Sequence, residues 1–184
     1  LVGSDPKNIK ANLGLARCYK QKREYRLSIQ HYMAAVILDS SDVEPLFSVG
    51  LLQLDMGMSN KNENDKTAAL ARFEAVKKIN PNFPRIYYFI AKTHFELGLY
   101  EQALDIVKIE KQKNPSLADP YILTAQIYMM KEKYVECAEE YQLAIKLRPV
   151  AENYVNAAIC YRKANMLDLA EEMLGYTVDI KDGK

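Results

Sequence analysis

The chain has 184 residues, 49% of them hydrophobic, and its 25 Lys and Arg residues nearly balance 24 Asp and Glu residues, for a net charge of +1. Such a chain can bury a substantial apolar core, which excludes a disordered protein, and its balanced charge disfavours nucleic acid or an anionic membrane as partner. No segment reaches the roughly 18 apolar residues of a membrane span, and the first residues lack a signal-peptide pattern, so we expect no direct membrane insertion.

Three cysteines, Cys18, Cys137 and Cys160, are widely spaced along the chain. They are too few for a disulfide framework and do not have the spacing of a zinc site, and each falls where a small buried residue is needed. We therefore expect reduced thiols, no metal and no cofactor. Reduced thiols and the missing signal pattern favour a cytoplasmic location.

Taken in chain order, the sequence divides into units with a period of 34 residues. Pro81, Pro115 and Pro149 are each 34 residues apart, and Tyr87 and Tyr121 repeat at the same interval. A fixed period of this length is typical of stacked helix–turn–helix units. We expect one array whose units cover residues 9–42, 43–83, 84–117, 118–151 and 152–184.

Two features interrupt this regularity. The second unit is seven residues longer than the period, and a polar run over residues 58–64 follows Gly57. Because exposed turns tolerate extra residues, we expect a loop insertion there, more plausibly a tolerated surface loop than a binding loop. The last unit is incomplete and lacks a polar capping helix, and residues 5–8 read as the tail of another unit, so we expect a piece of a longer array.

The units resemble the tetratricopeptide repeat family. That family prefers an aromatic residue at position 4, Leu-Gly at 7 and 8, Tyr at 11, Ala at 20, an aromatic at 24, Ala at 27 and Pro at 32. The match covers residues 5–179, with departures at Ser40, Gln53 and Glu110. The resemblance implies an all-α, right-handed superhelical solenoid of about five helix–turn–helix repeats, whose concave groove binds peptides or helices.

In this family the groove is lined mainly by positions 2, 5, 6, 9, 12 and 13 of each first helix. The first unit places a basic set there: Lys10, Leu13, Gly14, Arg17, Lys20 and Gln21. The second places there Glu44, Phe47, Ser48, Leu51, Leu54 and Asp55. The middle units are more apolar, which suits the burial of a partner's side chains.

The resemblance thus implies a protein-binding groove over the second to fifth units. We expect it to include Phe47, Leu51, Arg85, Tyr88, Phe89, Lys92, Ile122, Leu123, Gln126, Met130 and Asn156. Leu51, Phe89 and Leu123 are expected to touch the partner most directly. The alternative for Phe47, Tyr88, Phe95 and Met129 is packing against the next unit. The residues that grip an acidic chaperone tail in one subtype of the family are not reproduced, so we expect no such ligand.

The residues offer little for catalysis. His31 and His94 fall at packed positions of the repeat, and no phosphate-binding loop, nucleophile elbow or Cys-x-x-Cys motif is present. We expect a non-catalytic scaffold or adaptor rather than an enzyme. Three alternatives stay open: a module that assembles with copies of itself, a chaperone for an apolar export segment, and a regulatory module joined to an enzyme or membrane anchor outside these 184 residues.

Overall fold

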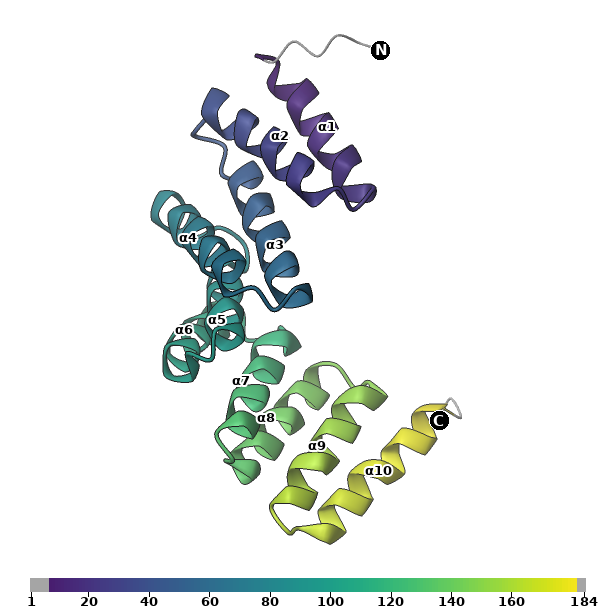
Figure 1. Ribbon diagram of the computed structural model, residues 1–184. Helices are drawn as coiled ribbons and strands as arrows, with labels where there is room; N and C mark the ends of the chain where they lie inside the picture. The colour runs from purple at the N-terminus through teal and green to yellow at the C-terminus, as the bar shows by residue number, and fades with distance from the viewer. Residues whose placement is uncertain (1–6, 182–184) are drawn as a thin grey trace. The chain divides into compact units, whose positions relative to one another are not determined.

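The structure is a computed structural model that describes residues 7–181. Within this range the chain forms ten α-helices and no strand (Figure 1). The helices are α1 (Ile9–Gln21), α2 (Tyr25–Leu38), α3 (Glu44–Ser59), α4 (Glu63–Ile79), α5 (Ile86–Glu96), α6 (Tyr100–Lys113), α7 (Ala118–Met130), α8 (Tyr134–Leu147), α9 (Ala151–Lys163) and α10 (Leu167–Lys181). The expected all-α fold is confirmed.

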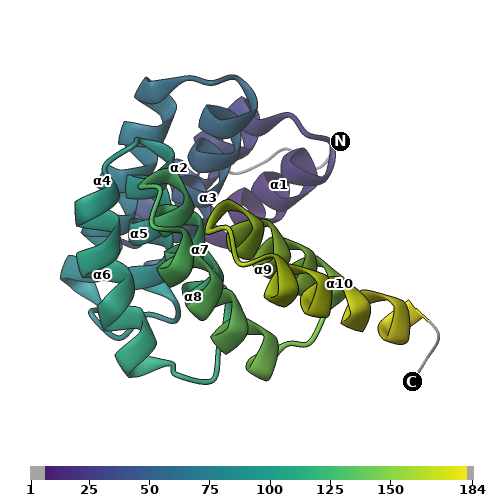
Figure 2. The ribbon, with the colours of Figure 1, turned by 90° about the horizontal axis from the view of Figure 1, so that it is seen from below.

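The chain separates into two compact units, the first ending at Leu99 and the second beginning at Tyr100. The first unit holds α1 to α5 and the second holds α6 to α10. In each, consecutive helices pack on one another, as α1 does on α2 and α9 on α10. α9 and α10 lie side by side in both views (Figure 1, Figure 2). The boundary falls inside the 84–117 segment that the sequence analysis treats as one repeat.

Short turns join the two helices of a hairpin, and they share one backbone feature. Arg23, Lys61, Gly98, Glu132 and Asn165 all have positive φ, between 52° and 75°. This left-handed conformation reverses the chain after the first helix, and it is free of steric cost only for glycine. Gly98 is the one glycine among these five residues.

The expected loop insertion at residues 58–64 is wrong. α3 continues to Ser59 and α4 begins at Glu63, so the additional residues lengthen both helices and leave a turn of normal size. Asn62 caps α4 by accepting a hydrogen bond from the Asn64 N–H at 2.9 Å, and Glu63 and Asp65 place negative charge at its positive end. The polar run therefore comprises the last residues of α3, the turn and the first residues of α4.

The longer hairpin is closed by Gly57. A Cβ at this position would lie 2.7 Å from Cγ of Lys66 and 2.9 Å from its backbone nitrogen, so α4 approaches α3 more closely than any other residue would allow. Lys66 then extends to α5, where its Nζ donates to the Glu96 carbonyl at 2.6 Å. One lysine thus links α4 to the C-terminal end of α5, where a cation is favoured.

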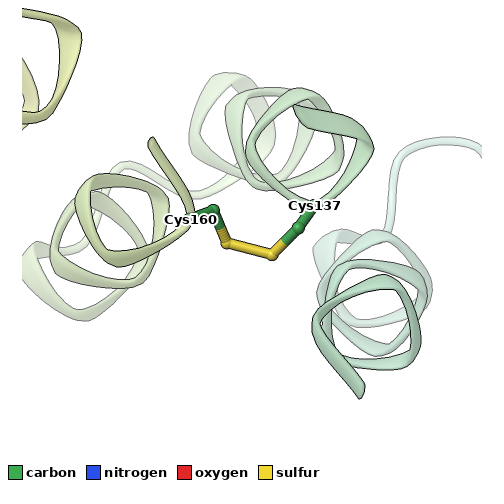
Figure 3. The surroundings of a disulfide bond; sticks show 2 residues. All are labelled: Cys137 and Cys160. Carbon is green, nitrogen blue, oxygen red and sulfur yellow. A yellow bond between two sulfur atoms is a disulfide. The ribbon is translucent and has the colours of Figure 1, made fainter. Parts of the chain in front are cut away.

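The core of the second unit contains a disulfide, which corrects the expectation of three reduced thiols. Cys137 on α8 and Cys160 on α9 are both fully buried and are bonded to each other across the helix pair (Figure 3). Cys18, on α1, is a free exposed thiol. The argument for a cytoplasmic location that rests on reduced thiols no longer applies. Among the described helices, none has both the length and the apolar character needed to cross a membrane.

Candidate functional site

The residues expected in the groove divide between the two units. Six of them, Phe47, Leu51, Arg85, Tyr88, Phe89 and Lys92, lie in the first unit. The other five, Ile122, Leu123, Gln126, Met130 and Asn156, lie in the second. Each group is considered by itself.

In the first unit, Phe47 and Phe89 belong to an aromatic cluster that holds α3, α4 and α5 together. The ring centroid of Phe47 lies 5.6 Å from that of Phe73, 4.7 Å from Phe83 and 5.2 Å from Phe89. Phe73 is completely buried, whereas Phe47 and Phe89 are half-buried. Most of the surface of these two rings is therefore used for packing, and their exposed edges are what is left for a partner.

The guanidinium group of Arg85 lies over two aromatic rings of α5. The guanidinium carbon of Arg85 is 4.6 Å from the ring centroid of Tyr88 and 5.6 Å from that of Phe89. Arg85 precedes α5 with a φ of 61°, which turns the chain sharply before the helix. Such cation–π contacts order a long side chain that would otherwise be mobile.

A cavity of about 570 Å³ lies in the first unit, between α1 and the start of α3. Its lining residues are Leu13, Arg17, Lys20, Gln21, Tyr32, Asp42, Glu44, Pro45 and Ser48. This volume is typical of sites that bind ligands. It is a hollow made by consecutive first helices, with the buried ring of Tyr32 from α2 among its walls.

Sequence reasoning found six of these nine lining residues as groove positions but missed Tyr32, Asp42 and Pro45. Tyr32 falls at position 24, where an aromatic packs between helices, and nothing in its spacing shows that it also borders a cavity. Asp42 precedes α3, where its Oδ1 accepts the Glu44 N–H at 3.0 Å. That Asx turn is the one signal that could have placed this carboxylate beside the first turn of α3.

The charges in this cavity stay apart. Arg17 and Lys20 come from α1, and Asp42 and Glu44 come from the start of α3. Within the described residues none of these four side chains takes part in an ion pair, although other lysines of the chain do, such as Lys77 with Glu74 at 2.5 Å. Both signs of charge therefore line the same hollow without neutralising each other directly.

In the second unit, one expected groove residue proves to be part of the core. Leu123 is only 3% exposed, because it lies on the side of α7 that packs inward, and it offers almost no surface to a partner. Ile122 is half-buried against the cluster that contains the disulfide. Met130, at 55% exposure, and Gln126 are open to solvent, and Asn156 is half-buried.

Both histidines lie among packed side chains. Nδ1 of His31 lies 3.0 Å from Oδ1 of Asn12, and its ring stacks on Tyr19 with 5.5 Å between centroids. His94 is half-buried, and desolvation lowers its pKa. Among the described residues no group of three or more His, Cys, Asp or Glu side chains is arranged to hold a metal ion.

These features define a class: an all-α array of tetratricopeptide-type hairpins with a ligand-sized hollow between first helices. A family model described as tetratricopeptide repeat matches residues 84–108. No curated protein sequence matches the chain significantly. The fold is that of tetratricopeptide repeat proteins.

Solved structures agree on this fold. MamA from Desulfovibrio magneticus RS-1 is similar with a TM-score of 0.83 and 18% identity, covering 98% of both chains. YrrB, described as a tetratricopeptide protein with an unusual peptide-binding site, has a TM-score of 0.71 and 16% identity over 98% of this chain and 90% of its own. A thermophilic tetratricopeptide protein from Thermus thermophilus has a TM-score of 0.68 and 18% identity, covering 94% of this chain and 91% of its own.

Proposed function

We propose that this chain is a non-catalytic scaffold that binds a peptide or helix of a partner protein on the first helices of its first unit. The observation that carries the proposal is the hollow between α1 and α3, which coincides with groove positions expected from the repeat register. YrrB has a peptide-binding site on the same fold, which supports this class of ligand.

The surroundings of the hollow suit recognition of an extended chain. Ser48 lines it, and the next residue toward the N-terminus, Phe47, belongs to the aromatic cluster. A ligand in the hollow can thus continue along α3 to the exposed edges of Phe47, Leu51 and Tyr88, and be held near Arg85 and Lys92. Because the cluster is packed before binding, little side-chain entropy is lost there.

Selection of random, end-capped dodecapeptides on the purified chain tests this proposal. The tightest selected peptides should bind the Ser48→Tyr variant at least about tenfold more weakly, because the added ring fills the hollow. Ser59→Tyr is the matched control, since Ser59 is exposed at the other end of α3 and does not line the hollow. Failure to select any peptide, or equal binding to both variants, would overturn the proposed site.

Self-association is a second candidate, favoured by one surface. Leu167 and Leu174 are seven residues apart on α10 and are 54% and 47% exposed, so they form an apolar stripe open to solvent. Light-scattering mass over a concentration series distinguishes the two. A constant mass near 21.1 kDa contradicts self-association; a mass that rises in the wild type and stays constant in Leu167→Glu, Leu174→Glu supports it.

A further inference from the structure

We propose that the hollow between α1 and α3 selects a peptide segment that carries one acidic and one basic side chain close together, and this inference rests on the proposed peptide-binding function. Its walls come from two elements of opposite charge: Arg17 and Lys20 on α1, and Asp42 and Glu44 at the start of α3. The same hollow therefore offers donors for a carboxylate and acceptors for an ammonium or guanidinium group.

The arrangement disfavours simpler ligands. An apolar segment would remove four charged groups from water without giving them partners, which costs free energy for each group. A wholly acidic segment would meet the carboxylates of Asp42 and Glu44, and a wholly basic one would meet Arg17 and Lys20. Only a segment with both signs pairs with each wall and repels neither.

The size of the hollow fits a short piece of extended chain. Its α1 wall runs from Leu13 to Gln21, which corresponds to about 12 Å along a helix axis. Three to four residues of extended chain span roughly that distance. In an extended chain, side chains two residues apart point to the same side, so a Glu and a Lys at that separation can both enter the hollow, where each pairs with the wall of opposite charge.

The helix ends support this polarity. Glu44 lies in the first turn of α3, where the exposed backbone N–H groups stabilise its negative charge, and Lys20 lies in the last turn of α1. Each wall thus carries side chains of one sign of charge, placed at a helix end that favours that sign. The charged groups of the ligand form the ion pairs that the four lining side chains do not form with one another.

Four libraries of end-capped dodecapeptides test the inference. The two residues at positions six and eight are fixed as Glu and Lys in either order, as Glu and Glu, as Lys and Lys, or as Ala and Ala, and all other positions are random. Selection on the purified chain should enrich the mixed-charge library most. Affinities of the resulting peptides should fall as salt is raised from about 50 to about 500 mM, as expected for exposed ion pairs.

Charge reversal on the protein gives the second readout. The Arg17→Glu, Lys20→Glu variant should bind the selected mixed-charge peptides at least about tenfold more weakly and should gain affinity for peptides from the Lys–Lys library. The control is Lys22→Glu, Arg26→Glu, which reverses two exposed charges that lie outside the hollow and outside the expected groove positions and should leave binding unchanged. Circular dichroism establishes that both variants remain folded.

The outcomes separate the two proposals. If none of the libraries yields a binder, the proposed peptide-binding function fails. If the Ala–Ala, Glu–Glu or Lys–Lys library yields the tightest binders, or if the Arg17→Glu, Lys20→Glu variant binds the selected peptides as well as the wild type, peptide binding stands and the mixed-charge inference is overturned.

Discussion

At the scale of single residues, Gly50 shows how closely α3 and α4 pack. An added Cβ would lie 2.7 Å from Cε1 of Phe73, a ring that is fully buried and in contact with two other aromatic rings. The ring can make room only by disturbing these contacts. We expect Gly50→Ala to lower the free energy of unfolding by about 1–3 kcal/mol, although alanine favours helix more than glycine does.

Gly14 provides the matched control for this prediction. It also lies within a helix, but a Cβ there would meet no atom within 4 Å. Gly14→Ala should therefore raise the free energy of unfolding by about 0.5–1 kcal/mol through helix propensity alone. Urea denaturation followed by circular dichroism measures both. Equal stability of the two variants would contradict the close packing described at Gly50.

His94 makes stability depend on pH. Burial lowers its pKa, with a smaller opposing effect from Glu74 and a further lowering by Lys77. Because the unfolded chain takes up this proton at higher pH than the folded chain, stability should fall as pH drops below about 6.5. The urea midpoint of the wild type should fall between about pH 7.5 and about pH 5.5, and that of His94→Phe should fall less. Parallel curves would show that His94 is not responsible.

At the scale of helices, α7 carries two residues that the repeat register places in the groove but that differ in their exposure to solvent. Leu123 is 3% exposed and Met130 is 55% exposed. Leu123→Ala should cost about 2–5 kcal/mol of unfolding free energy, as for other buried leucines. Met130→Ala should change it by less than about 0.5 kcal/mol. Thermal melts of both variants decide whether Leu123 belongs to the core. An unchanged melting temperature for Leu123→Ala would contradict its place in the core and favour the groove position.

The helices were the most predictable part of the fold, because hairpin packing imposes its own residue pattern. Gly98 marks a turn that needs positive φ, and its sequence signal is plain. Glu132 adopts the same conformation without such a signal. The run from Met58 to Asn64 was misread because Asn, which occurs three times in it, is favoured at helix N-caps as well as in turns, and only the backbone separates the two.

The candidate site was less predictable, since it depends on how helices meet. The register brought Arg17, Glu44 and Ser48 to groove positions, but it could not show that Asp42 joins them or that Leu123 turns inward. It also gave no reason to pair the two cysteines of α8 and α9, which are 23 residues apart in sequence. Their Cα atoms come within 5.9 Å only because α8 packs against α9.

At the scale of the whole molecule, the disulfide can be tested by counting the reactive thiols of the chain. A thiol reagent added to the unfolded chain without reductant should label one cysteine, Cys18, and should label all three after reduction. Three reactive thiols before reduction would show that Cys137 and Cys160 are not bonded. Cys18→Ser is the control, since it should leave no thiol reactive until reductant is added.

Reduction of the disulfide should then show how far a local loss of stability extends along the helices. The bond joins residues 23 apart, and a closed loop of that size stabilises the folded state by about 3 kcal/mol. The substantial contacts among the described helices join elements that follow one another in sequence, such as α8 with α9 and α9 with α10. In arrays of this kind, the stability of each repeat depends on its interfaces with the neighbouring repeats. Hydrogen exchange should therefore speed up most in α8 and α9 after reduction and stay unchanged in α1 and α2, whereas a uniform increase would show that all helices unfold as one cooperative body.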